Sequence, residues 1–325
     1  MFFQTDSISA KCPFYLLLII SVVVLNACSK RNPDVIVIAM PEGPATVSFI
    51  KMIEDRPLIN GKPVNFIIKQ EPSMLQAMMV QNQADFVVLP TNMAANLYNK
   101  KVDFRVMAIP VWGTLYLLTN TESDELSNLS NDEIHVFGRG TTADILLQDF
   151  LRSHNMKNAR INYSFNSNHE LALALINGKI RHAVVSEPLA SQLLPANGNL
   201  RILTAITVED KNNPDQNNIF VQTSLVVNKK FADKNPETIR QLAVAYNESC
   251  MFTTQFPDSA AALLYKHGFF AENKFDAAAI LRCNILYRKA SEVANQIGQY
   301  LEIFYDFDPE VLGGKIPDYE FVLHY

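Results

Sequence analysis

Residues 35–44 read Val-Ile-Val-Ile-Ala-Met-Pro-Glu-Gly-Pro, an apolar and largely β-branched run that stops at a proline. A continuous apolar run of this length is typical of a parallel strand that is buried on both faces, and proline and glycine end such a strand. A helix is predicted from about Ala45, because Phe49, Ile50 and Ile53 recur on one helical face. This stretch therefore predicts a strand, a turn and a helix.

The same alternation continues to about residue 100. Strands are predicted at residues 64–68 and 84–89, and each is followed by a helix. Ser73 is expected to cap the first of these helices, and the sequence Pro-Thr-Asn at residues 90–92 starts the second. A βαβαβα series implies right-handed crossovers and a mostly parallel sheet.

Residues 106–119 form an extended stretch that is too long for an ordinary strand, with expected interruptions at Pro110 and Gly113. Such a stretch suits a crossover between two domains. A second α/β series follows, with strands predicted at 134–137, 161–165 and 183–185 and helices at 142–153 and 170–177. Extended pieces between residues 200 and 227 bring the chain back, and residues 236–304 are predicted to be mainly helical.

The predicted fold class is α/β, with two lobes of parallel sheet that are joined by two extended crossovers. Residues 35–112 and 224–325 are assigned to lobe 1, and residues 113–223 to lobe 2. Ligands of open α/β sheets bind beyond the carboxyl ends of the strands. A ligand site between the lobes, closed by a hinge motion, is therefore expected.

The N-terminus has the features of a lipoprotein signal. An apolar run at residues 14–25 is too short for a spanning helix but suits the core of a signal peptide. Residues 25–28, Leu-Asn-Ala-Cys, resemble a lipobox, in which the cysteine is acylated. We expect residues 1–27 to be a signal peptide, residues 28–34 a tether lipidated at Cys28, and the mature chain to be anchored in the cell envelope facing the periplasm. A retained membrane anchor and a signal cleaved elsewhere are the alternatives.

Charge and cysteine content limit the partners. The chain has 28 Lys and Arg against 33 Asp and Glu, without a basic stripe, which argues against nucleic acid and leaves the lipid as the contact with a membrane. Cys250 and Cys283 can either form a disulfide in an oxidising compartment or remain small buried side chains. Neither has a histidine at metal-ligand spacing, so no metal and no cofactor are expected.

The sequence Gly-Arg-Gly-Thr-Thr at residues 138–142 lies where a strand passes into a helix. Its glycines allow close approach of a ligand, its free N–H groups can hold an electronegative group, and Arg139 can add a cation. The alternative is an ordinary turn with a capping box between Thr141 and Asp144. Trp112 is the only tryptophan and is either a stacking surface in the cleft or part of the core.

Loops after equivalent strands should converge on the same space, and their residues complete the predicted site. The predicted ligand-binding residues are Gly43, Thr91, Asn92, Trp112, Tyr116, Arg139, Gly140, Thr141, Thr142 and Glu187. The six histidines are scattered, and none lies beside a nucleophile or a metal-ligand pair. No catalytic residue is therefore predicted.

Several segments together resemble a known family: residues 84–92, 112–116, 138–142, 177–188, 282–285 and 313–318. The mature chain is similar over nearly its whole length to the periplasmic binding proteins for aliphatic sulfonates and taurine, nitrate and thiamine-precursor pyrimidines, in a subgroup of lipoproteins. The resemblance implies the type II periplasmic-binding-protein fold. His182 departs from the pattern, because the family often has an acidic residue there.

The resemblance implies a monomeric, non-enzymatic receptor that delivers a small solute to the permease and ATPase subunits of an ABC importer. The expected solute is anionic or heteroaromatic, such as a sulfonate or a pyrimidine. An enzyme of thiamine-pyrimidine synthesis is one alternative, although the cysteine cluster of that enzyme is absent from this sequence. A lipoprotein that senses a ligand or binds a partner protein is the other.

Overall fold

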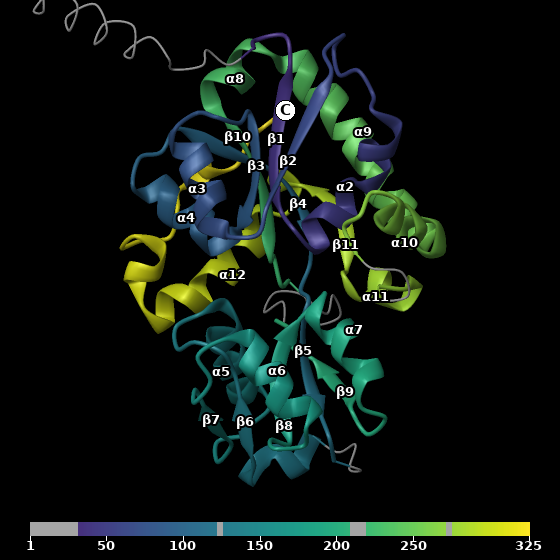
Figure 1. Ribbon diagram of the computed structural model, residues 1–325. Coiled ribbons are helices and arrows are strands. Elements are labelled where there is room, and N and C mark those ends of the chain that lie inside the picture. Colours follow the sequence, from purple (N-terminus) through teal and green to yellow (C-terminus); the bar gives the residue numbers. More distant parts are fainter. Residues whose placement is uncertain (1–31, 122–125, 209–218, 271–274) are drawn as a thin grey trace, which may run out of the picture. The chain divides into compact units, whose positions relative to one another are not determined.

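The computed structural model describes residues 32–121, 126–208, 219–270 and 275–325 (Figure 1). The predicted signal peptide and Cys28 lie outside these residues. Residues 35–325 form one structural unit. Within the described residues, no helix combines the length and the apolar character needed to cross a membrane.

The first sheet contains six strands in the order β11-β4-β10-β3-β1-β2. Their bounds are β1 (Ile36–Pro41), β2 (Val64–Lys69), β3 (Phe86–Pro90), β4 (Phe104–Val111), β10 (Thr223–Asn228) and β11 (Ile285–Lys289). Strand β1 pairs in parallel with both β2 and β3, whereas β10 runs antiparallel to β3 and β4, and β11 runs antiparallel to β4. The strands of the βα repeats are thus parallel, and the returning chain adds antiparallel pairs.

Helices cover both faces of this sheet. They are α2 (Pro44–Asp55), α3 (Pro72–Val80), α4 (Thr91–Asn99), α8 (Lys229–Lys234), α9 (Pro236–Gln255), α10 (Pro257–Lys266), α11 (Ala277–Arg282) and α12 (Ala294–Phe307). One apolar cluster joins the sheet to α2, α9, α10 and α11, and another joins it to α3, α4 and α12 (Figure 1). Short 3₁₀ helices occupy Leu126–Asn131, Leu194–Ala196, Ala290–Glu292, Pro309–Leu312 and Tyr319–Phe321.

The second sheet contains five strands in the order β7-β6-β8-β5-β9. Its elements are β5 (Leu115–Thr119), β6 (Glu133–His135), α5 (Thr142–Ser153), β7 (Arg160–Asn162), α6 (Asn168–Ile176), β8 (His182–Ser186), α7 (Leu189–Leu193) and β9 (Arg201–Ala205). Strand β6 is parallel to β7 and β8, and β5 is antiparallel to β8 and β9. Helix α5 packs on one face, and α6 and α7 pack on the other.

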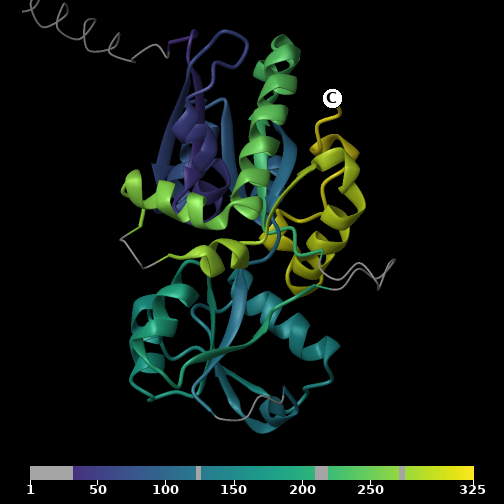
Figure 2. The same ribbon diagram turned by 90° about the vertical axis from the view of Figure 1, so that its right-hand side faces the viewer.

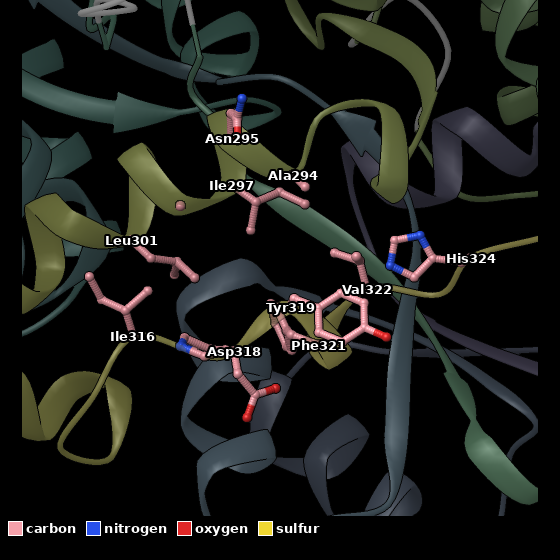
Figure 3. A pocket seen from close by; sticks show the side chains of 12 residues that line it. Ala294, Asn295, Ile297, Leu301, Ile316, Asp318, Tyr319, Phe321, Val322 and His324 are labelled. Carbon is pink, nitrogen blue, oxygen red and sulfur yellow. The ribbon is translucent and has the colours of Figure 1, made fainter.

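Two segments connect the sheets, and the first of them can be followed in Figure 2. The first is short, because β4 ends at Val111 and β5 begins at Leu115; the second returns from β9 to Thr223. Thr223 pairs with Val111 and with Pro90, and Leu115 pairs with Ser186. The carboxyl ends of β3, β4 and β8 therefore lie at the crossovers. This architecture confirms the predicted fold class, while the lobe boundaries at residues 112–113 and 223–224 stay a prediction.

Three local predictions were wrong. Pro110 does not interrupt β4, because the ladders to β10 and β11 both shift register beside it and such a bulge tolerates a residue without an N–H. Ser73 does not cap α3, whose N-cap is Glu71. The region predicted as helical contains β11, a short strand whose alternate residues are exposed.

Both cysteines outside the N-terminal segment are free and buried. Cys250 lies in α9, and Cys283 lies directly after α11. Burial raises the pKa of both thiols. Of the two alternatives, a disulfide or two small buried side chains, the structure therefore shows the second.

His182 begins β8 with its side chain buried. Its Nε2 atom lies 3.1 Å from a carboxylate oxygen of Asp132, while its Nδ1 atom is buried without a hydrogen-bond partner among the described residues. Burial lowers the pKa of this imidazole below the ordinary 6.5, and the Asp132 carboxylate only partly offsets the effect. The neutral imidazole is thus favoured by folding.

Because the pKa of His182 is lower in the folded chain, the unfolded chain binds this proton more tightly. The contribution to stability is complete above about pH 6.5 and is lost as the pH falls toward the folded pKa. We expect His182→Gln to reduce the loss of unfolding free energy between pH 7.5 and pH 5, measured by urea denaturation. His169→Gln, at an exposed position of the same lobe, is the control. An unchanged pH dependence in the His182 variant would refute this account.

Candidate functional site

The candidate site is built from loops at the carboxyl ends of strands. The loop after β1 contains Gly43, the end of β3 leads into Thr91 and Asn92, and the end of β8 leads into Glu187. The strand directions place these loops at the edges where the chain crosses between sheets. The side chains of the predicted site therefore start from one region of each lobe.

The two crossovers are hydrogen-bonded to each other. The Thr114 hydroxyl lies 2.8 and 2.9 Å from the two polar atoms of the Gln222 side-chain amide. The Gln222 N–H donates to the carbonyl of Val111, and its carbonyl accepts from the N–H of Thr91. A single glutamine thus ties the second crossover to the first crossover and to the start of α4.

Glu187 is buried in an ion pair with Arg282. Its carboxylate accepts from Arg282 Nε at 2.6 Å, from the Ser191 hydroxyl at 2.8 Å and from the Ser191 N–H at 3.1 Å. Arg282 Nη2 also donates to the Ser191 hydroxyl at 2.6 Å. The Glu187 side chain is fully buried, whereas that of Arg282 is 24% exposed. The predicted ligand-binding carboxylate is therefore neutralised by a side chain of the protein.

Tyr116 lies beside this ion pair. Its hydroxyl donates to the carbonyl of Arg282 at 2.7 Å, and the Asn284 side chain donates to the Gly113 carbonyl at 2.6 Å. Burial raises the pKa of the Tyr116 phenol, and the negative charge of Glu187 adds to the effect. Tyr116 is therefore a neutral hydrogen-bond donor.

Gly43 lies in the loop after β1, beside the loop after β8. Its φ of 116° is in the region that favours glycine, and a Cβ atom added there would lie 3.5 Å from Cδ of Pro188. The loops after β1 and β8 are thus in close proximity at this point.

Trp112 joins two strands of lobe 1. Its indole N–H donates to the carbonyl of Leu286 at 2.7 Å, and its backbone N–H donates to that of Asn284 at 3.1 Å. The ring is partly buried and packs against the core. The indole N–H is therefore engaged, and Trp112 can offer a ligand only the exposed part of its ring.

The turn at residues 138–142 has the predicted capping geometry. The Thr141 hydroxyl accepts from the N–H of Asp144 at 3.4 Å and donates to the carbonyl of Gly138 at 2.8 Å. The buried Asp144 carboxylate accepts from the N–H of Gly140 and from the hydroxyl of Tyr163, each at 2.7 Å. The hydroxyl of Thr141 is thus used by the turn itself.

Other donors of this turn remain open. Thr142 is half-buried, and no hydrogen bond of its hydroxyl or of the N–H groups of Thr142 and Ala143 is found within the described part of the chain. The Arg139 guanidinium is exposed and lies 4.7 Å from the ring centre of Tyr163. Burial and the hydrogen bond to Asp144 raise the pKa of Tyr163 to about 12. The beginning of α5 therefore presents a hydroxyl, two N–H groups and a cation.

Thr91 and Asn92 begin α4 and differ in their hydrogen bonding. Thr91 is buried with its hydroxyl 3.0 Å from that of Ser224. The amide oxygen of Asn92 is buried without a hydrogen-bond partner among the described residues. Of these two predicted site residues, only Asn92 retains an unused acceptor.

The structure thus connects some of the predicted residues and leaves others apart. Contacts bring Gly43, Tyr116 and Glu187 to one interlobe region, whereas the contacts of Arg139 and Thr141 in the described part of the chain lie within lobe 2. Sequence reasoning missed Arg282, Ser191, Asn284 and Gln222 as parts of the site. The described residues contain no cluster of His, Cys, Asp and Glu that could hold a metal ion.

The fold and the site together define a two-lobed binding protein with its candidate site between α/β lobes. No family model and no curated protein sequence matches the chain. An ABC transporter from Parabacteroides distasonis has a similar structure, with 30% identity, a TM-score of 0.81, and coverage of 90% of this chain and 99% of that one. The chain belongs to the family of periplasmic binding proteins of ABC transporters.

Two further structures share the fold at lower identity. The periplasmic aliphatic sulphonate binding protein SsuA from Escherichia coli has a TM-score of 0.68 at 16% identity. The alignment covers 88% of this chain and 96% of that one. The alkanesulfonate-binding protein SsuA from Xanthomonas axonopodis pv. citri, bound to MOPS, has a TM-score of 0.62 at 14% identity with the same coverage.

Two neighbouring threonines allow a direct test of the turn. Thr141→Ala removes an N-cap and should lower the unfolding free energy by about 1 kcal/mol. Thr142→Ala removes a hydroxyl that makes no hydrogen bond within the described chain, so its effect should stay within about 0.5 kcal/mol. Urea denaturation at pH 7.5 measures both values. Equal losses in the two variants would contradict the observed capping role.

Proposed function

We propose that the chain is a lipid-anchored receptor that binds a small solute between its lobes and delivers it to the permease and ATPase of an ABC importer. The unused donors at the beginning of α5 are the observation that carries this proposal. A helix of 12 residues begins there with open N–H groups, next to the Thr142 hydroxyl and the Arg139 guanidinium. The receptor acts as a monomer facing the periplasm and closes by a hinge motion.

The solute carries an electronegative group, in the first place a sulfonate or carboxylate. N–H groups at a helix N-terminus favour negative charge, and a guanidinium adds a planar cation. Glu187 does not oppose an anion, because Arg282 neutralises it. The two sulfonate-binding proteins with this fold support the same solute class. A pyrimidine, which offers neutral acceptors such as a ring nitrogen, is the second solute class.

Binding of methanesulfonate, MOPS, acetate and cytosine, measured by calorimetry, tests this solute class. For a sulfonate that binds, Thr142→Val should weaken binding about five- to hundred-fold, which corresponds to about 1–3 kcal/mol for a lost donor to a buried acceptor. Arg139→Gln should weaken the binding of an anion and leave the binding of cytosine unchanged. Arg152→Gln is the control, because this exposed arginine lies in the last turn of the same helix.

If all variants bind the sulfonate with an affinity within two-fold of that of the wild type, the beginning of α5 is not part of the site. In that case the side-chain N–H groups of Asn92, at the beginning of α4, become the stronger candidate donors. A weakening by Arg139→Gln alone would retain an anionic solute but exclude the Thr142 hydroxyl as its donor.

The anchor is proposed at Cys28, on the strength of the lipobox-like sequence that precedes it. We expect metabolic labelling with a clickable palmitate analogue to mark the wild type and Cys12→Ala but not Cys28→Ala. The Cys12 variant controls for loss of any cysteine in this segment. Equal labelling of the wild type and Cys28→Ala would rule out lipidation at this position.

A further inference from the structure

We propose that Arg282, Glu187 and Ser191 form an interlobe clasp that favours the closed arrangement of the lobes before any solute binds. Arg282 is then a positioning residue: it acts on solute capture through Glu187, without contacting the solute. This inference rests on the proposed function only in that closure captures the solute.

The two charged residues are held by different lobes. Glu187 and Arg282 are 95 residues apart in sequence. Glu187 directly follows β8 of lobe 2, and its carboxylate accepts from the N–H and hydroxyl of Ser191 in α7 of the same lobe. Arg282 ends α11, whose neighbours Ile280 and Cys283 are buried in the core shared with α2 and α9. The ion pair consequently links the cores of the two lobes.

The pair has the hydrogen bonds that a buried ion pair needs. A carboxylate that loses its hydration is costly unless a counter-charge and further donors replace the water. Glu187 receives three donors from Arg282 and Ser191, and the Ser191 hydroxyl, which donates to Glu187, accepts from Arg282 Nη2. Among the described residues, Arg282 is the cation paired with this carboxylate. Separation of the lobes would therefore break the charge pair and return both groups to water.

Contacts next to the ion pair join residues 113–116 to residues 282–284. The Tyr116 hydroxyl bonds to the Arg282 carbonyl, and Asn284 bonds to the Gly113 carbonyl and to the Tyr116 hydroxyl. The loop at Gly43 also approaches Pro188, the residue after Glu187. These contacts shield the ion pair from water, whereas an exposed ion pair contributes little to stability.

The clasp has a consequence for affinity. If a solute binds only the closed arrangement, its apparent dissociation constant equals the intrinsic one divided by the closed fraction. An interaction that raises the closed fraction thus tightens binding of every solute that the site accepts. The clasp would set the affinity range of the receptor, whereas the loop residues would set its selectivity.

Trp112 provides a readout that needs no solute. It is the only tryptophan, and its backbone N–H bonds to Asn284, two residues after Arg282. The full chain is purified in detergent, unfolded, dialysed and refolded to remove retained solute, and acrylamide quenching of Trp112 is measured. We expect Glu187→Gln and Arg282→Gln each to raise the quenching constant about two-fold or more. The double variant should resemble either single variant, because all three lack the same ion pair.

Glu237→Gln is the matched control, since it breaks the exposed pair with Arg240 in lobe 1 and should leave quenching unchanged. If Arg282→Gln does not fold, Arg282→Lys is used instead. It keeps the positive charge but lacks the planar guanidinium with its several N–H donors, and it should give an intermediate quenching constant. Wild-type quenching in a folded Glu187→Gln variant, or additive effects in the double variant, would overturn the clasp. Because no solute is used, these outcomes do not depend on whether the proposed sulfonate binds.

Discussion

Parallel pairing of β1 with β3, and of β6 with β8, is the constraint on which the rest of the structure depends. Parallel strands end at the same edge of a sheet, so the loops that follow them are brought together whatever their sequence. Both sheets also place that edge at the crossovers, because β4 leads directly into β5 and Leu115 pairs with Ser186. The position of the candidate site thus follows from strand direction.

The polar groups at these edges fall into two sets. Those of Thr91, Thr141 and Glu187 are satisfied by the protein, through a neighbouring hydroxyl, a helix cap and an ion pair. Those of Thr142 and Asn92 have no such partner in the described residues. The Asn92 oxygen is buried, and a buried polar group without a partner is costly, whereas the half-buried Thr142 hydroxyl is accessible to water or a solute. The first set holds the loops in place.

Much of the fold could be predicted from local sequence. Apolar β-branched runs such as residues 35–39 and the glycine turn before α5 carry their signal within a few residues. Strand β11 was missed because five residues with alternate exposure, between helices, give too weak a period. Pro110 was misread because the bulges that accommodate it depend on two partner strands.

The site was harder to predict, since its decisive contacts are long-range. The turn at residues 138–142 could be located from its glycines, but only the structure separates the engaged Thr141 from the open Thr142. Arg282 in the last turn of α11 looks like an ordinary cation at a helix C-terminus. Its pairing with Glu187, 95 residues away, has no local signature.

Single-molecule energy transfer between the lobes tests the central claim most directly. Dyes on Lys230→Cys in lobe 1 and Arg152→Cys in lobe 2, both exposed positions, report the separation of the lobes in a Cys12→Ser, Cys28→Ser background. If the clasp closes the receptor, the solute-free chain should show a dominant population of high transfer efficiency. A dominant population of low efficiency that closes only when a solute is added would contradict the account.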